Sequence, residues 1–183
     1  ELKGVVPALD YLIASNRKSL GDDVPSFNEG TLNAANKNVV VVGGGDTAMD
    51  CVRTAIRQNA KSVTCLYRRD RANMPGSQRE VQNAEEEGVN FQWLSAPTQF
   101  LGERKVSSVR AQRIHLGQPD STGRQVPNLV PGSEFDISAD IVIKALGFDP
   151  ENLPSMFNQP ALEVSKWGLS LIHISEPTRR AII

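Results

Sequence analysis

A run of four valines, residues 39–42, leads at once into three glycines and limits this chain to few folds. Uninterrupted β-branched residues are typical of a strand buried on both faces of a parallel sheet. The spacing that follows is G-x-G-x-x-A, in which Gly43 allows the tight turn, Gly45 lets a pyrophosphate approach, and Ala48 permits close helix packing. The helix is expected to start near Asp46, with its unpaired N–H groups facing the anion. The pattern predicts a dinucleotide-binding crossover.

The residues after the next predicted strand, 62–67, indicate which dinucleotide fits. A site for NAD(H) places Asp or Glu near the end of this strand, where the carboxylate binds the ribose 2′-hydroxyl. This chain has Arg68, Arg69 and Arg71 there instead. A guanidinium fork matches phosphate oxygens and cannot accept a hydroxyl proton. The sequence therefore predicts NADP(H) rather than NAD(H).

The remaining pattern predicts an α/β fold: a Rossmann-like parallel sheet with a crossover antiparallel β-meander. In chain order we expect a helix over 5–17 with apolar Leu9, Leu12 and Ile13, a linker over 21–37, helices over 47–58 and 77–87, a strand over 89–94, a meander over 98–114, a loop over 118–133, and strands over 134–138 and 140–144. Ser77 is the expected N-cap of the helix predicted over 77–87. The acidic run of that helix is expected to face solvent. Ala145 and Gly147 follow the last strand, where small residues let a ligand or another domain approach the backbone.

Composition excludes several classes of function. The net charge of −1 predicts no broad attraction to nucleic acid or to an anionic membrane. Cys51 and Cys65 lack C-x-x-C spacing, so we expect core residues rather than a metal site or a disulfide scaffold. The sequence has no apolar run of about 18 residues and no signal peptide, which favours a cytoplasmic protein. Because position 1 is not Met, we expect a piece of a longer protein.

The chain resembles the small (β) subunit of bacterial NADPH-dependent glutamate synthase over about residues 2–168, in the segments V-V-G-G-G-D-T-A-M-D-C-V-R-T-A, L-Y-R-R-D-R-A-N-M-P-G-S, E-E-E-G-V and I-K-A-L-G-F-D-P. That family belongs to the flavoproteins with two dinucleotide-binding domains, in which the NADPH domain is inserted into the FAD domain. The resemblance implies hydride transfer from NADPH to FAD and onward electron transfer through iron–sulfur clusters. The implied partner is a large (α) subunit that makes glutamate from 2-oxoglutarate and glutamine-derived ammonia.

The resemblance also implies roles for individual residues. The pyrophosphate would be held by Gly43, Gly44, Gly45, Asp46, Thr47 and Ala48. Arg68 and Arg69, with Arg71, would hold the 2′-phosphate. Ala145 and Gly147 would face the nicotinamide side. No side chain is expected to act as a general acid, base or nucleophile, because in hydride transfer the cofactors perform the chemistry.

Four parts are expected along the chain: a remnant of an FAD-domain segment with a linker (1–37), the NADPH-binding domain (38–150), a return segment toward the FAD domain (151–168), and a tail (169–183). The family's FAD fingerprint and cluster-binding cysteines would precede Glu1, and its second FAD segment would follow Gly168. This chain alone is therefore expected to bind NADP(H) and not FAD. Residues 169–179 resemble an in-frame translation of a transposase sequencing adapter, so the tail is expected to be non-native, although its alternation would allow a strand.

Two alternatives remain open. Subunits of electron-bifurcating or ferredoxin-linked NADPH oxidoreductases, and the amino-terminal part of dihydropyrimidine dehydrogenase, share the G-D-T-A and arginine features. The other alternative is a non-enzymatic nucleotide-binding or interaction module. The apolar face of the predicted 5–17 helix argues against such a module, because that face needs a partner surface.

Overall fold

The computed structural model describes residues 2–119, 125–147 and 151–169. The chain divides into two compact units, Glu1–Leu146 and Gly147–Ile183. The first unit holds every described strand and four helices, and the second holds the short helix α5 (Leu153–Met156). Most of the predicted tail, residues 170–183, lies outside the described residues. Among the described residues, no helix is both long and apolar enough to cross a membrane.

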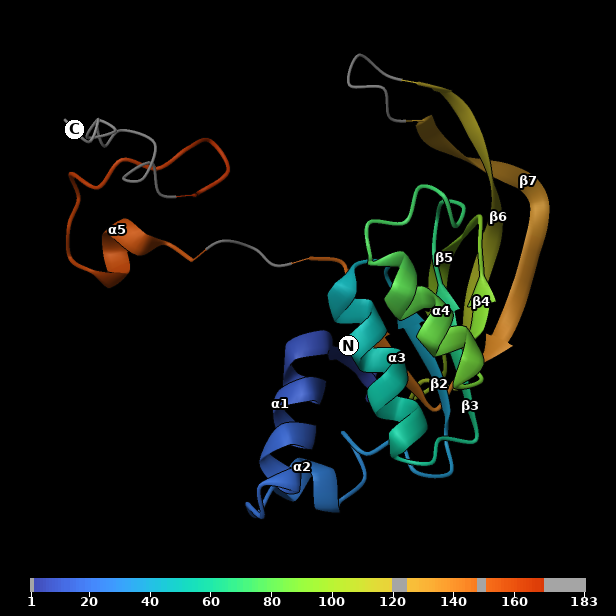
Figure 1. Ribbon diagram of the computed structural model, residues 1–183, viewed down its shortest axis with the longest axis horizontal. Helices are drawn as coiled ribbons and strands as arrows, with labels where there is room; N and C mark the ends of the chain where they lie inside the picture. Colours follow the sequence, from blue (N-terminus) through green and yellow to red (C-terminus); the bar gives the residue numbers. More distant parts are fainter. Residues whose placement is uncertain (1, 120–124, 148–150, 170–183) are drawn as a thin grey trace, which may run out of the picture. The chain divides into compact units, whose positions relative to one another are not determined.

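A five-stranded parallel sheet forms the centre of the first unit, in the order β1-β8-β2-β3-β4 (Figure 1). Its strands are β1 (Val5–Pro7), β2 (Asn38–Val42), β3 (Ser62–Leu66), β4 (Asn90–Gln92) and β8 (Ile141–Lys144). The helices are α1 (Ala8–Ser19), α2 (Pro25–Asn28), α3 (Asp46–Arg57) and α4 (Gln78–Glu86). A second, antiparallel sheet consists of β5 (Ser95–Leu101), β6 (Ser108–Pro119) and β7 (Gln125–Ser138).

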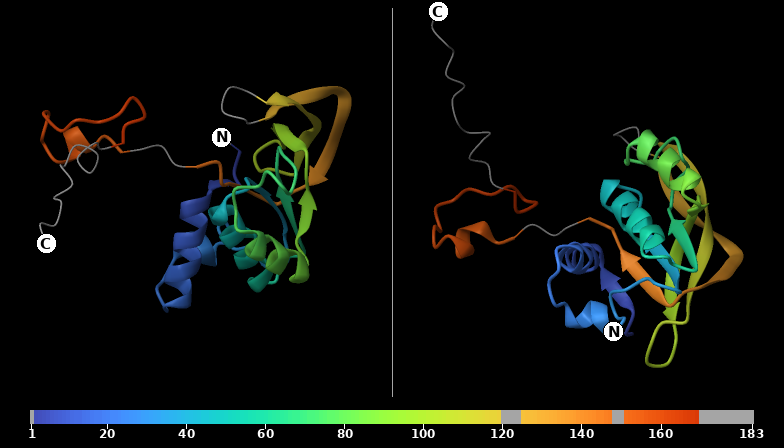
Figure 2. Two further views of the ribbon diagram at one scale, coloured as in Figure 1. Left: turned by 45° about the horizontal axis from the view of Figure 1, so that its top comes forward. Right: turned by 60° about the horizontal axis from the view of Figure 1, so that its bottom comes forward.

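The valine run explains how these elements stack in three layers. Val39 and Val41 join the core beneath the helices, whereas Val40 and Val42 join a second core beneath the antiparallel sheet. Alternate side chains of a strand point to opposite faces, so each face of β2 needs an apolar cover. The helices supply one cover and the meander the other (Figure 2). The predicted α/β class, with a parallel sheet and a crossover meander, is confirmed.

The sheet order places β2 at a reversal point. From β2 the chain passes through α3 to β3 on one side, while β8 on the other side is reached only after the meander. Open α/β sheets bind ligands outside the carboxyl ends of strands at such a point. There, Gly43 follows β2, Tyr67 follows β3 and Ala145 follows β8.

The amino-terminal prediction was wrong in one respect. Residues 5–7 form β1, which pairs in parallel with β8, and the helix begins only at Ala8. Helix α1 packs through Ala8, Tyr11 and Ala14, while the side chains of Leu9 and Ile13 are 46% and 52% exposed. Of the predicted apolar stripe, only Leu12 packs against the core, where it is partly buried, and Leu9 and Ile13 are left on the surface.

The loop predicted over 118–133 was also wrong. Strand β6 continues to Pro119 and β7 begins at Gln125, with residues 120–124 outside the described residues. Pro127 and Pro131 lie within β7, which pairs only with β6 and is therefore an edge strand. Proline is tolerated on an edge strand because the missing N–H can face away from the ladder. The prolines that suggested a loop mark this edge.

Candidate dinucleotide-binding site

The glycine turn, residues 43–48, is closely packed at its start. Gly43 has a φ of +149°, and a Cβ on it would lie 2.2 Å from the carbonyl oxygen of Ala145. A Cβ on Gly44 would lie 2.4 Å from the Cδ2 and Cε2 atoms of the Tyr67 ring. The Ala145 N–H donates a hydrogen bond of 2.8 Å to the Val42 carbonyl. The ends of all three neighbouring strands thus contact the turn, and its first two glycines are required by packing.

The next residue differs. Gly45 is the N-cap of α3, and a Cβ built on it meets no atom of the described residues within 4 Å. The first N–H groups of a helix have no intrahelical acceptor, and a glycine N-cap offers no side-chain acceptor. Ala48 is fully buried and holds α3 against the sheet. Open space therefore lies beside the positive end of the helix, as an anion-binding turn requires.

The arginine loop, residues 67–77, is fastened to the glycine turn at both ends. At one end the Tyr67 ring lies against Gly44. At the other, the Gly76 N–H donates to the Gly44 carbonyl at 2.9 Å, and the Ser77 N–H donates to Asp46 Oδ1 at 2.9 Å. Ser77 is the N-cap residue of α4, as predicted, and its side chain makes no capping hydrogen bond. The sequence showed M-P-G-S only as a turn and did not reveal its contact with the glycines.

The three arginines of this loop differ in how they are paired. Arg68 is exposed and has no ion pair among the described residues. Arg69 has a buried Nε without a hydrogen-bond partner in the described part of the chain, and its Nη2 reaches the Gln125 carbonyl only at 3.5 Å. Arg71 Nη1 lies 2.7 Å from Glu85 Oε2, so its charge is already compensated. Arg68 and Arg69 therefore retain donors for a phosphate.

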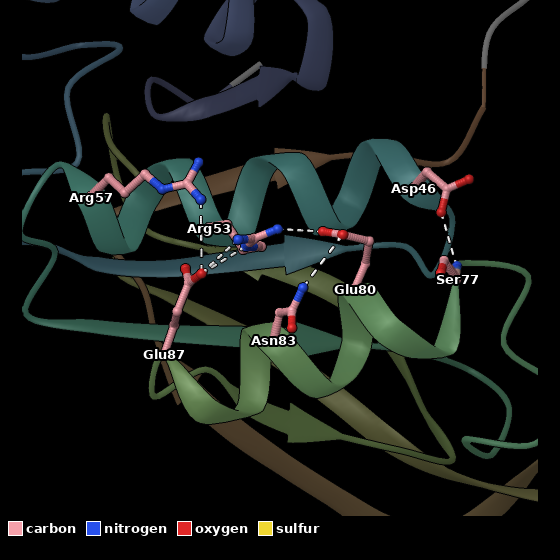
Figure 3. A network of polar contacts seen from close by, with 7 residues as sticks. All are labelled: Asp46, Arg53, Arg57, Ser77, Glu80, Asn83 and Glu87. Carbon is pink, nitrogen blue, oxygen red and sulfur yellow. Dashed lines mark hydrogen bonds and ion pairs between the residues drawn. The ribbon is translucent and has the colours of Figure 1, made fainter.

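A polar network joins α3 to α4 (Figure 3). Arg53 pairs with both Glu80 and Glu87, and its Nη2 lies 2.7 Å from Glu87 Oε1. Arg57 reaches the same Glu87 oxygen at 3.8 Å. The hydrogen bond from Arg53 lowers the pKa of Glu87 below its ordinary value. The predicted solvent-facing acidic run is therefore only partly exposed: Glu86 is exposed, whereas Glu80, Glu85 and Glu87 are half-buried and pair with arginines.

A family model described as pyridine nucleotide-disulphide oxidoreductase matches residues 2–172. The chain belongs to this family. It is 64% identical over 171 residues to the glutamate synthase [NADPH] small chain of Azospirillum brasilense, covering 93% of this chain and 36% of that protein. It is 46% identical over 134 residues to the NADPH-Fe(3+) oxidoreductase subunit beta of Geobacter sulfurreducens (strain DL-1 / KN400), covering 72% of this chain and 20% of that protein. The predicted resemblance to glutamate synthase small subunits is confirmed, and the chain spans only about a third or less of these relatives.

Among solved structures, FprA from Mycobacterium tuberculosis in complex with NADPH has a TM-score of 0.67. The match covers 84% of this chain and 47% of FprA at 16% identity. At that identity the likeness concerns the fold alone. It agrees with the family match in placing the chain among dinucleotide-binding oxidoreductase folds.

Gly147 has an unusual backbone conformation, and the two cysteines, Cys51 and Cys65, are buried. Gly147 is the first residue of the second unit and has a φ of +101°. Burial raises the pKa of the Cys51 and Cys65 thiols to about 12, so both remain protonated at neutral pH. No group of three or more His, Cys, Asp or Glu side chains suited to a metal ion occurs among the described residues. The chemistry that the site offers is anion binding.

Proposed function

We propose that this chain is the NADPH-binding part of an oxidoreductase that passes hydride from NADPH to FAD for glutamate synthesis from glutamine and 2-oxoglutarate. One observation carries the proposal: two arginines without ion pairs in the described chain, Arg68 and Arg69, lie next to the glycine turn. They follow β3, which pairs with β2, and the turn after β2 has open space at the start of α3. The 64% identity to a glutamate synthase [NADPH] small chain supports this choice of parent enzyme.

In this proposal the chain binds and orients, and NADPH supplies the hydride when it is bound. The pyrophosphate lies on the backbone of the glycine turn, where Gly45, Asp46 and Thr47 offer N–H groups beside Gly43, Gly44 and Ala48. Arg68 and Arg69 donate to the 2′-phosphate, and Arg71 contributes once it leaves Glu85. Ala145 and Gly147 face the nicotinamide side.

The rest of the reaction belongs to the longer parent. We propose that FAD and iron–sulfur clusters are bound there, that a large (α) subunit is the partner, that the enzyme is cytoplasmic, and that residues 1–183 alone do not oxidise NADPH. The part from 38 to 150 is the proposed NADPH-binding domain, flanked by remnants of the FAD domain over 1–37 and 151–168 and followed by a non-native tail over 169–183.

The test is to titrate the purified chain with NADP⁺ and, separately, with NAD⁺, and to measure each dissociation constant by isothermal titration calorimetry. Tighter binding of NADP⁺ is expected, because only that dinucleotide carries the 2′-phosphate for Arg68 and Arg69. Superimposable curves would contradict the proposed site. The same preparation should show no flavin absorbance and no NADPH oxidation, and a yellow, active preparation would contradict the proposed inactivity.

A second candidate keeps the site and changes the parent. The 46% identity to an NADPH-Fe(3+) oxidoreductase subunit beta favours a related ferredoxin-linked or electron-bifurcating oxidoreductase. Both candidates predict the same titrations, so the flanking genomic DNA separates them. A neighbouring gene for a glutamate synthase large subunit supports the first candidate, and a neighbouring gene for another electron-transfer subunit supports the second.

A further inference from the structure

The Asp46 side chain needs an explanation beyond the proposed pyrophosphate site. Its carboxylate lies in the first turn of α3, next to the open space at Gly45. A negative charge there repels a diphosphate at short range. The backbone N–H of Asp46 serves anion binding equally well with any side chain. An acidic side chain in the first turn stabilises the start of the helix, and this carboxylate also has a specific partner.

Within the described ranges, this carboxylate has one hydrogen-bond partner. Asp46 Oδ1 accepts the Ser77 N–H at 2.9 Å across 31 positions of sequence (Figure 3). A hydrogen bond from the Gly76 N–H to the Gly44 carbonyl lies directly beside it. Together with the Tyr67 ring under Gly44, these contacts hold the arginine loop at two points against the glycine turn.

We infer that Asp46 is a positioning residue for cofactor selectivity. Through Ser77 it keeps the arginine loop at a fixed distance from the glycine turn, so that one dinucleotide reaches both the helix start and the guanidinium groups. Without this hydrogen bond the loop keeps only one of its two hydrogen bonds to the glycine turn, from Gly76 to Gly44, beside the buried Met74 and the bond from the Tyr67 hydroxyl to the Asn73 carbonyl. Arg68 and Arg69 then lose their register with the 2′-phosphate. The inference rests on the proposed function, because it names what sets selectivity at that same site.

The tests use the whole 183-residue chain and two pairs of variants. Asp46→Ala removes the acceptor, whereas Asp46→Asn keeps an oxygen that accepts the same N–H. Ser77→Pro removes the donor at a φ of −55°, which suits proline, whereas Ser77→Ala keeps the N–H and removes only a hydroxyl that makes no cap. The proline variant leaves Asp46 untouched, and the other member of each pair is its matched control.

The measured quantity is the ratio of the NAD⁺ and NADP⁺ dissociation constants. Asp46→Ala and Ser77→Pro should each lower this ratio about tenfold. This is the effect of losing one hydrogen bond between a guanidinium group and the 2′-phosphate. In Ser77→Pro, binding of NAD⁺ should stay within about twofold, since NAD⁺ has no 2′-phosphate to misplace. In Asp46→Ala the lost negative charge acts on the diphosphate of both dinucleotides, so that effect cancels in the ratio. Asp46→Asn and Ser77→Ala should retain the wild-type ratio. Rescue by Asp46→Asn distinguishes positioning from a general loss of structure.

The outcomes separate the inference from the proposed function. A wild-type chain that does not prefer NADP⁺ contradicts the proposed function. A wild-type chain that prefers NADP⁺, with the preference unchanged in Asp46→Ala or in Ser77→Pro, overturns the inference alone. Equal losses in Asp46→Asn and Asp46→Ala also overturn it, because the charge rather than the hydrogen bond would then matter. Should Asp46→Ala fail to fold, the Ser77 pair decides.

Discussion

The glycine turn and the arginine loop adjoin each other but are built in opposite ways. Gly43, Gly44 and Ala48 are buried, and their neighbours fix the backbone of the turn. Arg68 is exposed, and Arg69 buries an Nε that no described residue satisfies. Backbone N–H groups at a helix start bind any diphosphate, whereas guanidinium groups respond to one added phosphate. Under the proposed function, affinity for dinucleotides therefore comes from the glycine turn, and selectivity among them comes from the arginine loop.

The largest expected effect is on the arginine loop. Replacing Arg68 and Arg69 by Ala should weaken NADP⁺ binding by about 1.5–3 kcal/mol for each lost charge-assisted contact. Binding of NAD⁺ should stay nearly unchanged, because the pyrophosphate remains on the glycine turn. Isothermal titration of both dinucleotides measures the two free energies of binding.

Arg79→Ala is the matched control for this experiment. Arg79 is an exposed arginine in the first turn of α4, so Arg79→Ala removes the same charge as Arg68→Ala or Arg69→Ala alone. An equal loss of NADP⁺ binding in Arg79→Ala would mean that net charge, and not the position of Arg68 and Arg69, governs selectivity. A parallel loss of NAD⁺ binding would place the arginines at the pyrophosphate instead.

A second experiment divides the glycine turn itself. Gly44→Ala should destabilise the chain by about 1–3 kcal/mol, the usual cost of overpacking, because its Cβ would meet the Tyr67 ring. Gly45→Ala should cost well under that in stability, since its φ of −89° suits alanine and its Cβ meets no described atom. Its methyl group should instead obstruct both dinucleotides. Chemical denaturation and titration of each variant measure these two effects.

The two glycine variants therefore make opposite predictions. Gly44→Ala loses stability, and Gly45→Ala loses binding of NADP⁺ and NAD⁺ alike. If Gly45→Ala binds both dinucleotides as the wild type does, the space beside α3 is not where the pyrophosphate lies.

Local patterns predicted much of this architecture, and contacts distant in sequence account for the rest. The valine run and the apolar face of residues 47–58 gave β2 and α3, because burial imposes periods of two and 3.6 residues on the sequence. The bond from Ser77 to Asp46 could not be predicted, since its donor is a backbone N–H that every residue but proline carries. Only the end of β7 was predicted, as a strand over 134–138, and residues 125–133 were taken for a loop because prolines are also typical of loops.

The acidic run of α4 shows the same limit and provides the smallest expected effect. Glu87 pairs with Arg53, 34 positions away in the sequence, in the second half of α3 (Figure 3). Glu87→Gln should destabilise the chain by up to about 1 kcal/mol at pH 7, the scale of a partly exposed ion pair. Glu86→Gln, which removes the same charge from an exposed neighbour without an ion pair among the described residues, should cost less.

The pH dependence of this difference has a definite sign. Arg53 lowers the pKa of Glu87 in the folded chain, so the unfolded chain binds the proton more readily. The stabilisation is therefore fully present above the unfolded pKa of about 4.3 and is lost as the pH falls through the lower folded value. Denaturation of wild type and Glu87→Gln at pH 7 and pH 3 should show the two curves converging at acid pH. The ratio of NAD⁺ and NADP⁺ dissociation constants should not change in this variant, because the pair ties α3 to α4 far from Ser77. A changed ratio would mean that selectivity depends on the whole α3–α4 contact and not on the arginine loop.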